Sequence, residues 1–169
     1  MMKSRLVVLD TNCLIQILGI HSKYRFLWSA FMTSGYVLCI SNEILHEYEE
    51  ILSQKASPLV ADMFLKVLAR SRNVIRKDPY FRFNLIEKDK DDNKFVDCAI
   101  CANAKYIVSE DHHFDVLKKC SFPKVEIVGI DLFANILKTR PYSALDEDSP
   151  MLLNEDMAEY SSNRSESNS

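Results

Sequence analysis

Four acidic residues stand where the strands and helices of a parallel sheet would bring their side chains together. Asp10 directly follows the apolar run 6–9, and Asp111 closely follows a later apolar run. Glu47 lies on the helix expected after the second run, and Asp92 opens the helix that leads to the later one. Functional residues of open parallel sheets gather at the carboxyl ends of the strands. No lysine or arginine stands among these strand-end candidates, so we expect a cluster of carboxylates.

A cluster of carboxylates favours bound metal. Crowded carboxylates repel one another and raise each other's pKa unless a cation neutralises them. Hard oxygen ligands suit Mg²⁺ or Mn²⁺, and such sites often serve phosphoryl chemistry, because the metal activates water and stabilises charge on the phosphate. A single strand-end aspartate is usually a helix cap or a solvated loop residue. Four acids with the same placement favour a divalent-metal site.

Glu47 breaks the amphipathic pattern of its expected helix. It comes three residues after Ile44, so it falls on or beside the apolar stripe that faces the core. Glu49 and Glu50 are better placed for solvent. Glu43, one turn before Glu47, flanks it nearer the helix start, and we expect it in a supporting position around the acidic cluster.

Asp92 also breaks its local pattern. At about 100° per residue, it projects close to the centre of the apolar face of the helix expected over 93–104, whereas Asp91 and Asp97 project toward solvent. The apolar face is made by Phe95, Val96, Ala99 and Ile100. The positive end of the helix dipole favours an ionised carboxylate at this point. A plain helix-capping role explains Asp92 about as well, so both interpretations stay open.

The hydrophobic pattern predicts the scaffold that positions these acids. Short, continuous apolar runs read as strands buried on both faces, and amphipathic segments between them read as helices. Strands alternating with helices imply a three-layer α/β/α domain with a central, mainly parallel five-stranded sheet. The expected strands cover 6–9, 36–40, 73–76, 106–109 and 125–128, and the expected helices cover 12–19, 22–33, 41–52, 58–68, 93–104, 114–117 and 132–137.

Composition sets the domain boundaries and limits the partners. The 169 residues carry a net charge of −3, so nucleic-acid binding would need a local basic patch or bound metal. We expect one domain over 1–139 and an acidic C-terminal extension over 140–169. The extension could form one short amphipathic helix over 151–160, and its last residues should be disordered.

The chain is expected to be cytoplasmic. The apolar run 6–9 is shorter than the roughly 7–15 residues of a secretory core, and no stretch approaches the roughly 20 apolar residues of a membrane span. The five cysteines are scattered and odd in number, which fits reduced thiols. Cys98 and Cys101 have redox or zinc spacing, but they lie inside a predicted helix with no second pair.

Four segments together resemble the motifs of the PIN domain family. The segment 6–12 is similar to the family's opening strand, which ends in Asp-Thr-Asn or Asp-Thr-Ser. The segment 41–47 is similar to the second motif, whose later Glu is the acidic ligand. Residues 91–95 resemble the third, in the variant of PilT N-terminus-like toxin-type nucleases. Residues 106–111 resemble the fourth, with Ser109 for the usual Thr and Glu110 for the usual small residue.

This resemblance implies a metal-dependent nuclease, commonly a ribonuclease and often the toxin of a toxin–antitoxin pair. Such domains are frequently homodimers. Water would attack the phosphate in line, and the carboxylates would hold Mg²⁺ or Mn²⁺ rather than act as covalent nucleophiles. The implied partners are RNA and a protein antitoxin, with no membrane. The implied catalytic and metal ligands are Asp10, Glu47, Asp92 and Asp111, and the supporting or substrate-contacting residues are Asn12, Glu43 and Ser109.

Two other functions compete with the nuclease. A non-catalytic PIN-like scaffold would bind RNA or protein without cutting, although the presence of all four acids argues against it. A phosphorylatable receiver domain has similar alternation, but it needs adjacent acids after the first strand and a lysine after the fifth, and neither is present. A P-loop or dinucleotide site is disfavoured by the lack of a glycine-rich loop.

The basic residues and histidines near the acids are ambiguous. His112 and His113, next to Asp111, could touch substrate phosphate, but a solvated turn is the simpler interpretation. The basic side chains that flank the acids in sequence could steer nucleic acid or form a solvated face. They are Arg82, Lys88, Lys90 and Lys94.

Overall fold

The structure is a computed structural model and describes residues 6–139. Five parallel strands form a sheet at the centre of this part of the chain. Their order in the sheet is β3-β2-β1-β4-β5. Each is a short run of apolar residues, and β1 is buried along its whole length, as a strand covered by helices on both faces must be. The strands are β1 (Leu6–Leu9), β2 (Val37–Ile40), β3 (Val74–Arg76), β4 (Tyr106–Val108) and β5 (Glu126–Val128).

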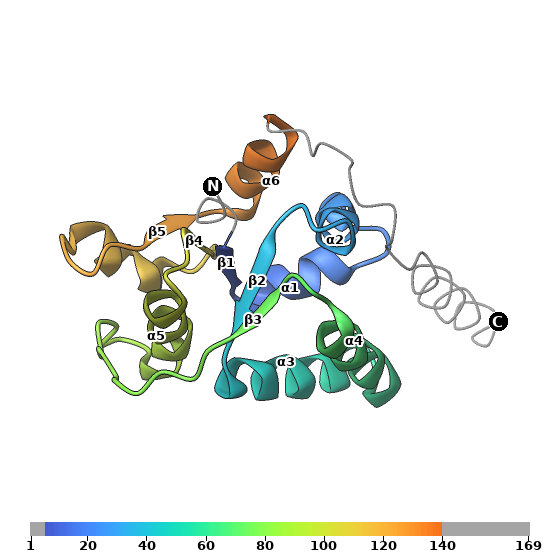
Figure 1. The fold of residues 1–169 in the computed structure, drawn as a ribbon, viewed down its shortest axis with the longest axis horizontal. Coiled ribbons are helices and arrows are strands. Elements are labelled where there is room, and N and C mark those ends of the chain that lie inside the picture. Colours follow the sequence, from blue (N-terminus) through green and yellow to red (C-terminus); the bar gives the residue numbers. More distant parts are fainter. Residues whose placement is uncertain (1–5, 140–169) are drawn as a thin grey trace.

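Helices cover both faces of this sheet. Figure 1 shows α5 on one side and α1, α2 and α4 on the other. α5 contacts β1, β2 and β4, while α3 packs on α4. The helices are α1 (Thr11–Leu18), α2 (Arg25–Met32), α3 (Asn42–Lys55), α4 (Pro58–Arg70), α5 (Asn93–Ala102) and α6 (Ile130–Thr139), with 3₁₀ segments η2 (Lys90–Asp92) and η3 (His112–Lys119). The predicted three-layer fold is confirmed.

Local chemistry sets the helix starts. The Ser41 side chain accepts the N–H of Ile44 at 3.3 Å and begins α3. The Ser57 side chain accepts the N–H of Val60 at 3.1 Å, and Pro58 fills the first turn of α4, where its missing N–H costs nothing. These caps fix where α3 begins, and therefore which of its residues reach the sheet edge.

Element boundaries differ from the sequence expectations by a few residues. The helix expected from residue 22 begins at Arg25, and the helix expected over 93–104 ends at Ala102, because Asn103 takes a left-handed φ of 54°, the usual way to end a helix. The short helix expected over 114–117 is the longer 3₁₀ segment η3.

The order of the strands decides which side chains meet. β1 is the central strand, hydrogen-bonded to β2 on one side and β4 on the other. Residues that follow β1 and β4 are therefore neighbours at the carboxyl edge, and the start of α3 follows β2 at the same edge. Within residues 6–139, no helix has the length and apolar character needed to span a membrane. The expectations for 140–169 lie outside the described residues.

Candidate acidic active site

Asp10 and Asp111 are joined through one hydroxyl at the carboxyl edge of the sheet. Asp10 follows β1 directly and is only 6% exposed. Ser109 follows β4, and its Oγ–H donates to Asp10 Oδ2 at 2.7 Å. The same Oγ accepts the N–H of Asp111 at 3.0 Å. Ser109 therefore fixes the Asp10 carboxylate and the backbone that carries Asp111.

Glu47 reaches the same edge from α3. Thr11 Oγ1–H donates to Glu47 Oε1 at 2.5 Å, so the residue after Asp10 orients the carboxylate of the second acid. Lys94 on α5 forms an ion pair with Glu47 Oε2. The Glu47 side chain is 21% exposed, whereas Glu49 and Glu50 are exposed on the outer face of α3, as the amphipathic pattern predicts.

Asp92 completes the cluster through His113. Asp92 occupies the N-cap position of α5, as the capping interpretation expects, but its side chain makes no capping hydrogen bond there. Its Oδ2 lies 3.2 Å from Nδ1 of His113, and the same nitrogen lies 3.3 Å from Asp111 Oδ1. Asp89 Oδ2 is 3.8 Å from that nitrogen. His113 Nδ1 therefore contacts three carboxylates, whereas the sequence suggested a solvated turn residue.

Burial and mutual repulsion perturb two of these acids. Burial is the main cause that raises the pKa of Asp10; the hydrogen bond from Ser109 opposes it, and the charges of Glu47 and Asp111 add to it. Burial also raises the pKa of Asp92 to about 6, against the hydrogen bond to His113 and with the charges of Asp89, Asp10 and Asp111. A site that disfavours its own ionised form is one that a cation would stabilise.

Lys94 is a positive charge inside the cluster, which corrects the expectation that no lysine stands among the acids. Its side chain is only 10% exposed and pairs with Glu47 and, at 3.0 Å, with Asp91. Burial alone would lower the pKa of Lys94, but its hydrogen bonds to the two acids raise it. Lys94 lies two residues after Asp92 in the sequence, but this spacing does not show that its side chain points toward Glu47.

The four predicted ligands lie at the carboxyl edge of the sheet, but their carboxylates are too far apart to bind one ion together. A metal ion needs three or more ligand atoms close together. Among the histidines, cysteines and acids of residues 6–139, one group has its ligand atoms within 4.8 Å of one another: Asp89, Asp92 and His113. No three of the four predicted carboxylates meet that limit. Instead, Lys94 pairs with Glu47, and His113 lies between Asp92 and Asp111.

The donor set suits a hard divalent cation. Carboxylate oxygens favour Mg²⁺ and Mn²⁺. The residues that could hold an ion are Asp10, Glu47, Asp92 and Asp111. Of these, only Asp92 belongs to the one group within residues 6–139 whose ligand atoms lie within 4.8 Å of one another, together with Asp89 and His113, which the sequence did not predict as ligands. Two features of the sequence could have indicated these ligands. Asp89 lies next to the predicted third motif, and His112 and His113 directly follow Asp111.

The three residues predicted to support the cluster differ in placement. Ser109 is buried between two of the acids, as described above. Asn12 is exposed in the first turn of α1. Glu43 is half-exposed and accepts a hydrogen bond from Arg82 at 2.6 Å, so it points toward the neighbouring pocket rather than toward Asp10.

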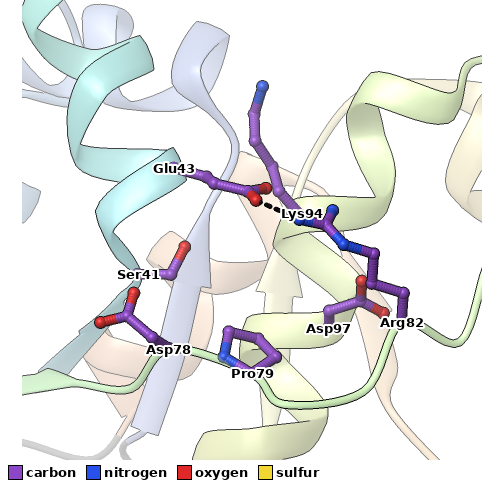
Figure 2. A pocket seen from close by; sticks show the side chains of 7 residues that line it. All are labelled: Ser41, Glu43, Asp78, Pro79, Arg82, Lys94 and Asp97. Atoms are coloured by element: carbon purple, nitrogen blue, oxygen red, sulfur yellow. Dashed lines mark hydrogen bonds and ion pairs between the residues drawn. The ribbon is translucent and has the colours of Figure 1, made fainter.

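Asp97 is buried, which corrects its predicted solvent face. It is 3% exposed, and its Oδ1 accepts the N–H of Phe83 at 3.1 Å. The helical projection assumed one packed face, but the segment after β3 covers a second face of α5. Figure 2 shows Asp97 beside Arg82 in a pocket lined by Ser41, Glu43, Asp78, Pro79, Arg82, Lys94 and Asp97.

The other sequence features have structural explanations. Cys98 is buried and Cys101 is exposed, so the two thiols of the CxxC spacing face different environments, and all five cysteines are free. Glu110, the departure from the fourth motif, accepts the N–H of Ile130 at 2.7 Å. It thereby satisfies a free backbone donor at the start of α6.

Comparisons with known proteins identify the family and the fold. No curated protein matches the chain significantly. Among solved structures, the fold is similar to that of VapBC2 from Rickettsia felis bound to a DNA fragment from their promoter, with a TM-score of 0.51 and 16% identity over 73% of this chain and 98% of that one. At this identity the similarity is one of fold. The family model described as "PIN domain" matches residues 6–113, a span that holds all four acids and both hydroxyl donors, and the chain belongs to the PIN domain family.

Proposed function

We propose that this protein is a metal-dependent endoribonuclease that hydrolyses RNA phosphodiesters with Mg²⁺ or Mn²⁺. PIN domains are generally metal-dependent nucleases, and the acids of this chain fit that chemistry. The observation that carries the proposal is the continuous network of contacts from Glu47 through Thr11 to Asp10, and from Asp10 through Ser109 to Asp111, whose carboxylate His113 links to Asp92.

Each residue of the network has a stated role. Asp10, Glu47, Asp92 and Asp111 would hold the cation, which would supply a Lewis acid to activate water and stabilise charge on the phosphate. Thr11 and Ser109 hold the carboxylates in one orientation, which lowers the cost of assembling the site. Asn12 and Glu43 are the proposed outer contacts to substrate or cation. Because Lys94 is positive and borders the pocket of Figure 2, it would also attract a phosphate.

The test is cleavage of a mixed RNA pool with Mn²⁺ by the parent and two variants, Asp10→Asn and Glu47→Gln. Both substitutions keep the shape and remove one charge, so activity should fall by orders of magnitude while the fold survives. Melting is measured in parallel. Equal activity of the Asp10 variant and the parent would contradict the metal-dependent nuclease, and no cleavage by either protein would favour the non-catalytic scaffold.

The matched controls are exposed acids away from the cluster. Glu49→Gln makes the same change as Glu47→Gln two residues along α3, on its exposed face. Asp62→Asn makes the same change as Asp10→Asn on α4, where Asp62 pairs with Lys66 at 2.7 Å. Both should keep full activity. Asp97→Asn is unsuitable as a control because Asp97 is buried.

We also propose that the protein acts in the cytoplasm as the toxin of a toxin–antitoxin pair, as a homodimer with a protein antitoxin as partner. The support is the family and the fold shared with VapBC2. Expression of the parent should then arrest growth while Asp10→Asn does not, and light scattering should give twice the chain mass. Harmless expression of an active enzyme would refute the toxin, and a monomer mass would refute the dimer.

A further inference from the structure

A cluster of exposed aromatic side chains lies on the segment 77–89 between β3 and η2, here called the aromatic loop. Tyr80 is 96% exposed, Phe81 77% and Phe83 41%. Neighbouring exposed aromatic side chains often mark an interaction site, and loops of this length without secondary structure are usually either functional or linkers. The three rings take no part in the acidic cluster, so their exposure needs another explanation.

The aromatic loop is held in place by hydrogen bonds at both ends. Asp78 Oδ1 accepts the N–H of Asn42 at 2.7 Å, and the N–H of Phe83 donates to Asp97. Farther along, the Asn93 side chain donates to the carbonyl of Ile86 at 2.8 Å and accepts its N–H at 2.9 Å. The rings are therefore presented on a fixed backbone, which lowers the entropy cost of binding.

These attachments lead to the helices that carry the acidic site. Arg82 pairs with Glu43 on α3, one turn before Glu47, and Asp97 lies one turn after Lys94 on α5. Figure 2 shows Arg82, Glu43 and Lys94 around one pocket, with the chain of the aromatic loop passing below them. The pocket therefore connects the aromatic loop with Lys94, which pairs with Glu47 of the acidic site.

Basic side chains accompany the rings in the sequence. The aromatic loop has three basic and three acidic side chains, and Arg76 and Lys90, which flank it directly, bring the basic count to five. Asp78 is engaged with the start of α3 and Asp89 with the backbone of η2. Arg82 stands between Phe81 and Phe83 and pairs with Glu43.

We infer that the aromatic loop is a stacking platform that binds single-stranded RNA and leads it into the acidic site. Aromatic rings offer faces on which unpaired bases stack, and neighbouring arginines and lysines neutralise the phosphates. Bases of a duplex are already stacked on one another, so they do not offer these faces. The inference rests on the proposed ribonuclease for its direction, but binding by the aromatic loop can be measured without cleavage.

The experiment measures binding of a fluorescent oligouridylate by anisotropy in EDTA, where metal-dependent cleavage cannot occur. The test variant is Tyr80→Ala with Phe81→Ala; both side chains are largely exposed, so the fold should survive. The control is Phe122→Ala, an aromatic that is 89% exposed in the segment before β5, at the amino edge of the sheet. The double variant should bind at least about tenfold more weakly, and Phe122→Ala should match the parent.

A hairpin duplex RNA serves as the second probe. Its weaker, electrostatic binding should be nearly the same for the parent and the double variant. Equal losses on both RNAs, no loss on either, or no binding of oligouridylate by the parent would overturn the inference. If oligouridylate binding depends on the rings but the protein does not cleave RNA with Mn²⁺, the inference about the aromatic loop is supported and the proposed nuclease activity is refuted.

Discussion

Without divalent metal, the domain should become less stable as pH rises from about 5 to about 7.5. Asp92 has an ordinary pKa of 3.8 that burial raises to about 6 in the folded protein. The folded state therefore holds this proton more tightly than the unfolded state does. Stability falls with rising pH wherever the folded state binds more protons. The loss therefore begins near the unfolded pKa of 3.8, and the part that remains above pH 5 is complete by about pH 7.5.

The size of the effect follows from the shift. About two pKa units at about 1.4 kcal/mol each give roughly 3 kcal/mol over the whole window. About half of that, near 1.5 kcal/mol, falls between pH 5 and 7.5. For a domain of this size that corresponds to roughly 3–6 °C in melting temperature. Burial raises the pKa of Asp10 as well, so its contribution has the same sign.

The assay is thermal melting in EDTA at several pH values for the parent and for Asp92→Asn. The asparagine variant keeps the shape but has no proton to exchange, so the difference between the two proteins isolates Asp92 from every other titrating group. Millimolar Mn²⁺ should remove most of the parent's loss at the higher pH, because the ion binds the ionised, folded form. Parallel pH profiles for parent and variant in EDTA would refute the reasoning.

Three further substitutions test the contacts around the acids. Lys94→Met leaves the partly buried Glu47 without its counter-ion and should lower stability by about 1–3 kcal/mol, with part recovered in Mn²⁺; a melting curve unaffected by the change would contradict this. Ser109→Ala removes the donor to Asp10 and should cost about 1 kcal/mol in urea unfolding, together with lower cleavage activity. Glu110→Ala removes the carboxylate at the start of α6 and should cost about 0.5–2 kcal/mol, seen as a lower urea midpoint; an unchanged midpoint would mean that water replaces the cap.

The sheet and the placement of the acids could be predicted because each depends on local chemistry. A run of buried β-branched and aliphatic residues such as 6–9 has few alternatives to a central strand. Glu47 could be placed because a glutamate on the apolar stripe of α3 is costly without a partner. These predictions needed only the periodicity of one element and the rule that parallel strands end at a common edge.

The errors came from contacts between segments distant in sequence. Asp97 was expected in solvent because the projection of α5 considered only the sheet, and the aromatic loop covers the other face of that helix. His113 was expected in a turn because nothing in its neighbours indicates that Asp89 and Asp92 approach it from before α5. Such contacts depend on how a long connection folds back, which periodicity does not encode.

The short polar residues after the strands explain why the acids can be crowded at all. Thr11 follows Asp10 in sequence but donates to Glu47, and Ser109 precedes Asp111 but donates to Asp10. Each hydroxyl therefore stabilises an acid from a different segment, and each is fixed by the strand end beside it. Positive charge comes from Lys94, which pairs with Glu47, while Nδ1 of His113 lies within 3.3 Å of both Asp92 and Asp111. A divalent ion that joins the carboxylates must replace the contact of Lys94 with Glu47, so weakening that ion pair should change metal affinity as well as stability.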